Sequence, residues 1–398
     1  MVERFPVKRL EQCITQEKAM KQNCQSIALA ALLASAAAPN PAQSATDEAD
    51  PQHPLVQVAI LLDTSNSMDG LIDQAKGQLW KIVNEFITAR QNGKAPELQV
   101  ALFEYGKSSL PAAQGFIRLI QPLTTDLDKI SEELFALKTN GGEEYCGWVI
   151  QEAVERLAWS SSPDVYRAIF IAGNEPFTQG KVNYAGACKA AIAKGIIVNT
   201  IHCGNPAEGI HTKWQDGALL ADGKFMTIDH NRAVVHFEAP QDKEIARLSA
   251  ELNKTYIAYG VGGREAAKRQ AVQDANASSV APSGALLQRS LTKASSNYRN
   301  DTWDLVDAVK NGRQTLAEVK TEDLPVEMQK LSADERKAYV ESKARERTEI
   351  QGKINQLNQA RVKYVADRMK AQSATNTFDS VVVSTIREQA AKKNYRFE

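Results

Sequence analysis

The sequence contains few cysteines and no long apolar run. Only 5 of its 398 residues are cysteine, and Cys13 and Cys24 lie close to the amino terminus. Cys146, Cys188 and Cys203 remain, so an exported form has enough for one disulfide with one thiol left over, and the spacing does not select the pair. No stretch of about 18 or more apolar residues occurs, and we therefore expect no integral membrane span.

The chain also lacks an excess of charge of either sign. Lys plus Arg and Asp plus Glu both number 48, so the formal net charge is zero. No global basic field attracts nucleic acid or an anionic membrane, and we expect no nucleic-acid partner. The hydrophobic content of 43% is that of a globular protein, and the length leaves room for one large domain plus an appendage.

Recognisable catalytic motifs are missing as well. We find no nucleophile elbow, no phosphate-binding loop and no zinc-hydrolase helix motif. The glycine-rich residues 260–263 follow a predicted strand, but Glu265 stands where a dinucleotide-binding loop requires glycine or alanine. We therefore expect a protein that is not an enzyme.

Residues 1–45 have the pattern of a signal peptide. Lysines flank Met20 and precede residues 26–38, an Ala/Leu-rich segment that is too short to span a membrane and is followed by small residues. Met20 is a better start than Met1, which would give an unusually long n-region. We expect cleavage and a periplasmic or secreted protein; a disordered tail on a cytoplasmic protein is the alternative. Residues 46–55 read as a linker.

The rest of the chain is organised around residues 56–68. The aliphatic run 56–62 predicts a strand buried on both faces, and Asp63, Ser65 and Ser67 follow at alternate positions. One carboxylate and two hydroxyls at this spacing converge on a hard cation, because Mg²⁺ and Ca²⁺ prefer oxygen donors. The alternative is a turn that caps the next helix without a metal. That helix has an apolar face made of Leu71, Ala75, Leu79, Ile82, Val83 and Phe86.

Strand and helix patterns alternate from residue 56 to residue 260. The alternation predicts an α/β fold with a doubly wound, mostly parallel six-stranded sheet. We expect the strands at 56–62, 98–105, 116–120, 167–171, 196–202 and 254–259. The long connection at about 204–236 contains turn residues and two short apolar runs, which predict an inserted hairpin.

An Asp-x-Ser-x-Ser turn after a buried first strand resembles the metal-ion-dependent adhesion site of von Willebrand factor type A (vWA) domains. In that family a second loop resembles Gly-Gly-Thr, whereas here Glu143 follows the two glycines and Thr139 lies four residues earlier. Glu143 either binds the metal or complements the dipole of the next helix. The resemblance implies Mg²⁺, or Ca²⁺ or Mn²⁺, held by residues drawn from Asp63, Ser65, Ser67, Glu143 and Thr139.

The third loop departs from the family pattern, which resembles Thr-Asp-Gly-Glu-Pro. Matching Glu175 and Pro176 to its end puts Gly173 where the family has an aspartate, so that Asn174 or Glu175 substitutes only if the loop is shifted. With Glu143 in the second loop, the site would still hold two carboxylates. We therefore favour a modified site that binds metal over one that has lost it.

The resemblance covers residues 56–264 and says nothing about the rest. Residues 265–298, rich in Ser, Ala and Asn, predict a linker, and 299–398 predict a helical region. In that region Ser332 and Glu335 form a capping box at the start of a long charged helix. Its apolar stripe breaks the heptad rhythm, which favours a helix that folds back on its neighbours or borrows a partner over a sustained coiled coil.

The leader pattern and the candidate metal site together predict an exported binding protein. Because the site residues leave coordination positions open, we expect its divalent cation to bridge to a carboxylate of a partner protein. The alternative is a metal-free vWA scaffold that interacts through its C-terminal helices, and deletion of residues 299–398 is expected to distinguish the two. A zinc site is a further alternative, although its candidate ligands have no tight ligand spacing: His202, Cys203, His211, His230 and His236. The oligomeric state does not follow from the sequence.

Overall fold

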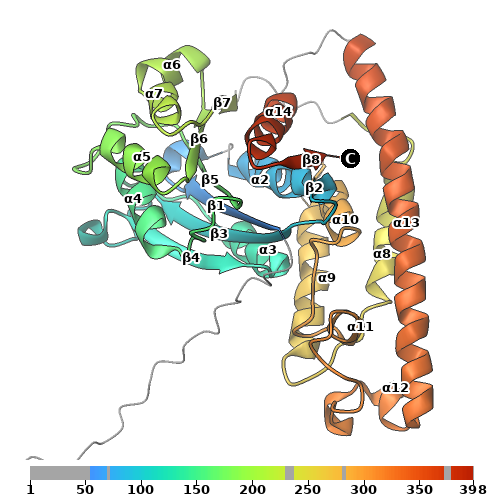
Figure 1. Cartoon of the computed structure of the whole chain (residues 1–398). Helices are drawn as coiled ribbons and strands as arrows, with labels where there is room; N and C mark the ends of the chain where they lie inside the picture. The colour runs from blue at the N-terminus through green and yellow to red at the C-terminus, as the bar shows by residue number, and fades with distance from the viewer. Residues whose placement is uncertain (1–53, 70–71, 229–236, 280–283, 372–377, 398) are drawn as a thin grey trace, which may run out of the picture. The chain divides into compact units, whose positions relative to one another are not determined.

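The computed structural model describes residues 54–69, 72–228, 237–279, 284–371 and 378–397 (Figure 1). The predicted leader and most of the predicted linker 46–55 lie outside these residues, and so do His230 and His236. Within the described part of the chain, no helix is both long enough and apolar enough to cross a membrane.

A six-stranded sheet lies at the centre, in the order β4-β3-β1-β5-β6-β7. Its strands are β1 Leu55–Asp63, β3 Glu97–Tyr105, β4 Ile117–Thr124, β5 Tyr166–Gly173, β6 Ile197–Cys203 and β7 Phe225–Ile228. Edge strand β4 runs antiparallel to β3, and the other neighbours are parallel. This confirms the doubly wound, mostly parallel sheet. Because β1 and β5 are parallel, Asp63 and Gly173 end their strands at the same edge.

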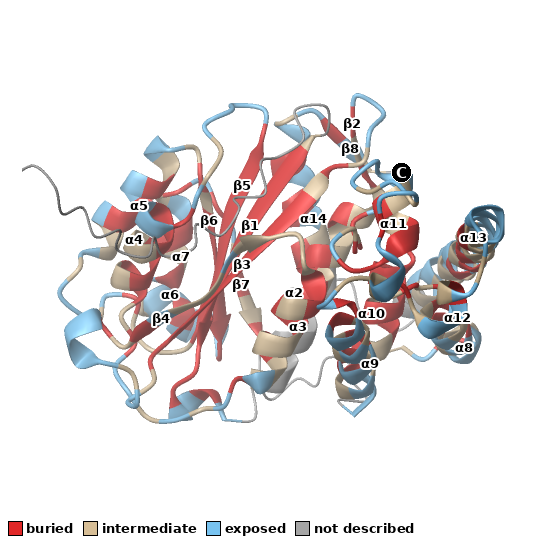
Figure 2. Ribbon diagram, turned by 90° about the horizontal axis from the view of Figure 1, so that it is seen from below, coloured by how far each residue is buried: buried red, intermediate tan, exposed pale blue. Residues whose placement is uncertain are grey.

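Helices cover both faces of the sheet (Figure 2). One face packs against α2 Ile72–Glu85, α3 Leu127–Ala136 and α14 Phe378–Ala391, and the other against α4 Cys146–Arg156, α5 Tyr184–Ala193 and α7 Trp214–Leu219. Every residue of β1 is buried. Val58 and Ile60 belong to the first core, and Ala59 and Leu61 to the second. Burial on both faces explains why this strand is aliphatic at every position except Gln57 and Asp63.

The sixth strand is not the predicted one. Residues 254–259 contribute only an isolated bridge between Ala258 and Asp304. The sixth strand is β7, which lies in the predicted insertion 204–236 after α6 Pro206–His211 and α7. The insertion therefore begins with two short helices rather than a hairpin arm, and the predicted second arm lies almost entirely outside the described residues.

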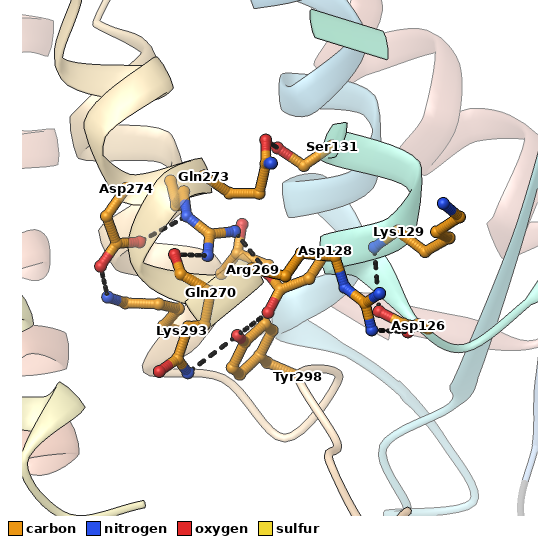
Figure 3. A network of polar contacts seen from close by, with 12 residues as sticks. Asp126, Asp128, Lys129, Ser131, Arg269, Gln270, Gln273, Asp274, Lys293 and Tyr298 are labelled. Carbon is orange, nitrogen blue, oxygen red and sulfur yellow. Dashed lines mark hydrogen bonds and ion pairs between the residues drawn. The ribbon is translucent and has the colours of Figure 1, made fainter. Parts of the chain in front are cut away.

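The predicted linker at 265–298 is largely helical. It contains most of α9 Gly263–Ser279 and all of α10 Ala285–Lys293. These helices meet α3 through a network of polar contacts that includes Asp128, Asp274 and Lys293 (Figure 3). Arg289 belongs to this network and lies 2.8 Å from Asp128 and 2.5 Å from Asp274. The ammonium group of Lys293, itself fully buried, lies 2.6 Å from Asp274. The polar composition that predicted a linker thus belongs to a buried joint between helices.

Five more helical segments lie between β7 and α14, before and after the predicted linker: α8 Asp242–Asn253, α11 Leu305–Lys310, η5 Thr321–Asp323, α12 Val326–Gln329 and α13 Ala333–Ala371. The predicted capping box is present, because the Ser332 N–H donates to the Glu335 carboxylate at 2.8 Å. Ile350 and Ile354 of α13 are buried with residues of α8 and α10. The long helix therefore packs along its neighbours, which was one of the two expected arrangements.

The last described residues return to the sheet. Val382 and Ile386 of α14 are fully buried in the first core. The Tyr395 hydroxyl donates to the Leu55 carbonyl at 3.0 Å, and β8 Tyr395–Phe397 pairs with β2 Ala89–Gln91. Residues 299–398 are therefore not a separate helical region, because their final segment completes the core of the sheet domain.

The three cysteines of the described chain form no disulfide. Cys146, Cys188 and Cys203 are all free and buried. The disulfide that these three cysteines would permit in an exported protein is therefore not formed, and each cysteine packs as a small apolar residue in the core.

Candidate metal centre

The first loop brings its three predicted side chains together. Asp63, the last residue of β1, is fully buried, and its Oδ1 accepts the Ser65 N–H at 2.8 Å. The hydroxyl oxygens of Ser65 and Ser67 lie 2.7 Å apart. Oδ2 of Asp63 has no hydrogen-bond partner among the described residues. A buried carboxylate oxygen without a partner carries a free-energy cost, and a bound cation is one way to remove it.

The acidic residue of the second loop that faces Asp63 is Glu144 rather than Glu143. Glu144 is only 5% exposed, and its carboxyl group lies close enough to Asp63 and Ser65 for both to shift its pKa. A Cβ atom at Gly106 would lie 2.7 Å from Oδ1 of Asp63 and 2.8 Å from Cγ of Glu144, so both acidic side chains contact the same point. Glu143 is exposed and lines the cleft described below. The second carboxylate near Asp63 therefore belongs to Glu144, one residue after the predicted Glu143.

Thr139 does not join this group. Its hydroxyl donates to the carboxylate of Asp69, an exposed residue that follows the first loop. The Asn140 N–H donates to the Thr64 carbonyl at 2.9 Å, so the second loop is fixed to the first through its backbone. Thr139 therefore ties the two loops together instead of pointing its hydroxyl at Asp63.

The third loop contacts the first loop through the side chain of Asn174. Gly173 contributes no side chain, as expected, but Oδ1 of Asn174 accepts the Ser67 hydroxyl at 2.9 Å. Nδ2 of Asn174 donates to the Ser67 carbonyl at 3.3 Å. Glu175 lies beside this contact and lines the cleft. Asn174 therefore joins the third loop to Ser67, and its role as a replacement for the family aspartate stays a prediction.

These three loops enclose an open cleft of about 320 Å³. The Glu144 N–H closes one side by donating to the Gln179 side chain at 3.0 Å. None of the residues that line the cleft is basic; they are Ser65, Asn66, Ser67, Gly141, Gly142, Glu143, Glu144, Glu175 and Gln179. The cleft therefore offers oxygen donors and negative charge with no compensating cation in its lining.

The electrostatics of the cleft follow from burial and like charge. Burial raises the pKa of Asp63 to about 7, hydrogen bonds from Ser65 offset part of the rise, and the negative charge of Glu175 adds to it. Burial also raises the pKa of Glu144 to about 8, and the charges of Asp63 and Glu175 raise it further. Such carboxylates hold protons near neutral pH unless a positive ion replaces those protons.

The donor set fits a hard divalent cation. Two carboxylates and two hydroxyls supply the oxygen ligands that Mg²⁺, Ca²⁺ and Mn²⁺ accept. Among the described residues, no group of three or more His, Cys, Asp or Glu side chains is placed to hold a metal. A metal in this cleft would therefore depend on Ser65 and Ser67 as well as on Asp63 and Glu144.

Sequence reasoning missed Glu144, Gly106 and Gln179. Glu143 and Glu144 are adjacent, and both precede α4, which begins at Cys146. No local pattern distinguishes them. A long-range contact decides which glutamate faces Asp63. Gly142 packs against the backbone of Gly106 so closely that a Cβ atom at Gly142 would lie 2.3 Å from the Gly106 carbonyl oxygen. The two loops thus approach so closely that the chain direction at Glu144 is fixed.

A scan of protein-family models finds no match to the chain, and a search of curated proteins finds none either. Among solved structures, the chain is similar to the conserved hypothetical protein BatB from Bacteroides thetaiotaomicron, with 20% identity and a TM-score of 0.35. That match covers 44% of this chain and 90% of that one. The SpRpn10 VWA domain matches with 20% identity and a TM-score of 0.35, over 44% of this chain and 88% of that domain.

A third similar structure is proximal thread matrix protein 1 from the mussel byssus, with a zinc-occupied MIDAS motif. It is 13% identical with a TM-score of 0.34, over 45% of this chain and 43% of that one.

The fold assignment depends on features of the chain itself. The sheet order reverses direction at β1 and β5, the edge strand β4 is antiparallel, and helices cover both faces. The Asp-x-Ser-x-Ser loop that begins at Asp63 lies at this reversal, where doubly wound sheets place their ligands. The sheet domain of this chain has the von Willebrand factor type A fold.

Proposed function

We propose that this chain is a non-enzymatic, protein-binding vWA protein whose cleft holds a divalent cation and presents it to a carboxylate of a partner protein. The observation that carries the proposal is the buried Asp63 carboxylate, whose Oδ2 has no partner among the described residues and which lies beside Glu144 and Ser65. Mg²⁺ is the first candidate, and Ca²⁺ or Mn²⁺ are alternatives.

A partner carboxylate follows from the number of ligands that the cleft supplies. Mg²⁺ takes six ligands in near-octahedral geometry, and the side chains of Asp63, Ser65, Ser67 and Glu144 offer fewer. The remaining positions would face the open side of the cleft, where water or an external oxygen completes the shell. A carboxylate is the protein group best suited to that position, because it carries charge and oxygen donors together.

A binding role is also favoured over catalysis by the hydrogen bonds in the cleft. The Ser65 and Ser67 hydroxyls bond to each other, and Ser67 bonds to Asn174. Among the described residues, neither serine is paired with a histidine as a nucleophile would be. Export remains part of the proposal and depends on the leader pattern of residues 1–45. The mass of the mature protein recovered from cells would test it by showing whether that segment is removed.

Calorimetric titration with Mg²⁺, Mn²⁺ and Ca²⁺ tests the metal. The wild-type chain is expected to bind at least one of them, and Asp63→Asn is expected to abolish binding while leaving the fold intact. Asp69→Asn is the matched control, because Asp69 is an exposed carboxylate of the same segment that contacts Thr139 instead of the cleft. Absence of binding for all three ions, or equal binding by Asp63→Asn, rejects the proposal.

The second candidate is the metal-free scaffold, and the glycine at position 173 favours it. Deletion of residues 299–398 does not distinguish the two candidates, because it removes buried residues of α14 from the sheet core. Substitution on the exposed side of α13 is the better test. Val362 is 58% exposed there, and Val362→Glu should weaken partner binding only if the scaffold interacts through its helices.

A further inference from the structure

A strip of aromatic side chains adjoins the metal cleft. We define the aromatic strip as Phe116, Tyr145, Trp148 and Lys181, whose ammonium group lies over the Trp148 ring. The Tyr145 and Trp148 rings are stacked, with centroids 6.2 Å apart and an angle of 6° between planes. The Phe116 centroid lies 5.9 Å from that of Tyr145, and Nζ of Lys181 lies 4.3 Å from the Trp148 ring centroid. All three rings are half-buried, so part of each remains accessible.

The aromatic strip is built by the same loops as the cleft. Tyr145 directly follows Glu144, and a Cβ atom at Gly180 would lie 2.6 Å from Cδ1 of Tyr145. Gln179, the residue before Gly180, lines the cleft. On the other side the Gly106 N–H donates to the Phe116 carbonyl at 3.1 Å, and Gly106 contacts Asp63. The loops that line the cleft therefore also hold the strip.

The backbone is strained where it holds this strip. Gly115 has φ +72°, and a Cβ atom there would lie 2.5 Å from Cε3 of Trp148. The next residue, Phe116, has φ 54°, a value that bulky residues rarely adopt. Strained residues persist where the surroundings or the function require them. Because Phe116 is only half-buried, core packing alone is a weak reason for the strain.

We propose that the aromatic strip receives a large apolar side chain of the partner, adjacent in sequence to the acidic residue whose carboxylate reaches the cation. This inference rests on the proposed function. Rigid aromatic rings supply much contact area at a low entropic cost and are enriched where binding energy concentrates in interfaces.

Lys181 adds charge complementarity to the strip. It is exposed and makes no ion pair within the described part of the chain. It comes two positions after Gln179, which lines the acidic cleft. A second acidic group of the partner can pair with its ammonium group. The occupant is therefore an acidic peptide segment of another protein that carries an aromatic or large aliphatic residue beside its metal-binding acid.

Selection from a random peptide phage library on the immobilised full chain in Mn²⁺, with elution by EDTA, tests this inference. We expect eluted peptides in which an acidic residue neighbours an aromatic or large aliphatic residue. Eluted peptides with an acid but no such neighbour would overturn the role of the strip and leave the metal-dependent function standing. Absence of any EDTA-eluted peptide would contradict the proposed function, and this inference with it.

Substitution of the lysine separates the strip from the metal. Lys181→Glu should weaken a selected peptide by about fivefold, while Mn²⁺ affinity without peptide stays unchanged. The matched control is Lys189→Glu, at an exposed lysine on α5 outside the strip, which should change neither value. An equal loss of peptide binding in both variants would show a non-specific effect of charge and overturn the assignment of Lys181.

Discussion

Gly173 lies directly against Asp63 at the edge of the sheet. A Cβ atom at Gly173 would lie 3.0 Å from Oδ2 of Asp63 and 2.5 Å from the hydroxyl oxygen of Tyr105. That hydroxyl donates to the Ala172 carbonyl at 3.0 Å and is fully buried. The corner that holds an aspartate in the vWA family pattern is thus filled by Tyr105.

The first prediction concerns this corner. Gly173→Asp should lower the free energy of unfolding by about 1–3 kcal/mol, because the new side chain meets a close-packed wall, and it should not tighten metal binding. Adding Tyr105→Phe to Gly173→Asp should recover part of the lost stability, because it removes the hydroxyl that the new side chain meets. Chemical denaturation measures both effects, with Gly186→Ala as a control in open space. Tighter Mg²⁺ binding by Gly173→Asp at unchanged stability would show that the corner accepts the carboxylate.

The pH dependence of the metal-free protein is the second prediction. The pKa values of Asp63 and Glu144 are about 7 and about 8 in the folded protein, against ordinary values of 3.8 and 4.5. At a pH between the ordinary and the raised pKa values, the folded state therefore binds more protons than the unfolded state. Stability should fall as pH rises from about 4 to about 8.

Metal should reverse this trend, because a cation replaces the protons on the two carboxylates. Mg²⁺ should raise the melting temperature more at pH 8 than at pH 5. Thermal unfolding across this range, with and without Mg²⁺, gives the measurement, and the double variant Asp63→Asn, Glu144→Gln should flatten the metal-free profile. A metal-free profile that rises over this window would contradict the electrostatic account of the cleft.

A third prediction concerns the buried joint of Figure 3. Asp128 is 2% exposed; it pairs with Arg289 and accepts the Tyr298 hydroxyl at 2.6 Å. Asp128→Asn would leave two buried cations, Arg289 and Lys293, to share the single carboxylate of Asp274, so that one buried positive charge is uncompensated. We expect a loss of about 3–5 kcal/mol in the free energy of unfolding.

The neighbouring residue supplies the control for that joint. Lys129 is 33% exposed and pairs with Glu132 and Glu133 on the surface of α3. Lys129→Gln should therefore cost less than about 1 kcal/mol. Denaturation by urea compares the two variants. Similar losses in both would mean that the joint contributes no more than a surface ion pair.

The sequence predicts those parts of the fold that depend on local pattern. The nearly continuous aliphatic run 56–62 belongs to β1, because a strand buried on both faces favours apolar side chains on both. Asp63, Ser65 and Ser67 were found because three ligands in one turn meet whenever that turn forms. The capping box at Ser332 was found for the same local reason.

The parts that sequence reasoning missed depend on long-range contacts. Glu144 faces Asp63 because Gly142 and Gly106 bring their loops together. Residues 254–259 resemble a strand as closely as β7 does, but only β7 pairs with β6. The polar composition of residues 285–293 predicts a linker, but these residues form α10. Their charged side chains, among them Arg289 and Lys293, pair with residues on other helices, and no local pattern shows such partners.

The measurement that tests the account most directly compares two adjacent glutamates. Electron paramagnetic resonance titration with Mn²⁺ would give the affinities of wild type, Glu144→Gln and Glu143→Gln. Because ligand charge sets the affinity of such sites, Glu144→Gln should weaken binding by about tenfold or more, and Glu143→Gln by no more than about twofold. Weakening by Glu143→Gln alone, or unchanged affinity in both variants, would contradict a cation held between Asp63 and Glu144.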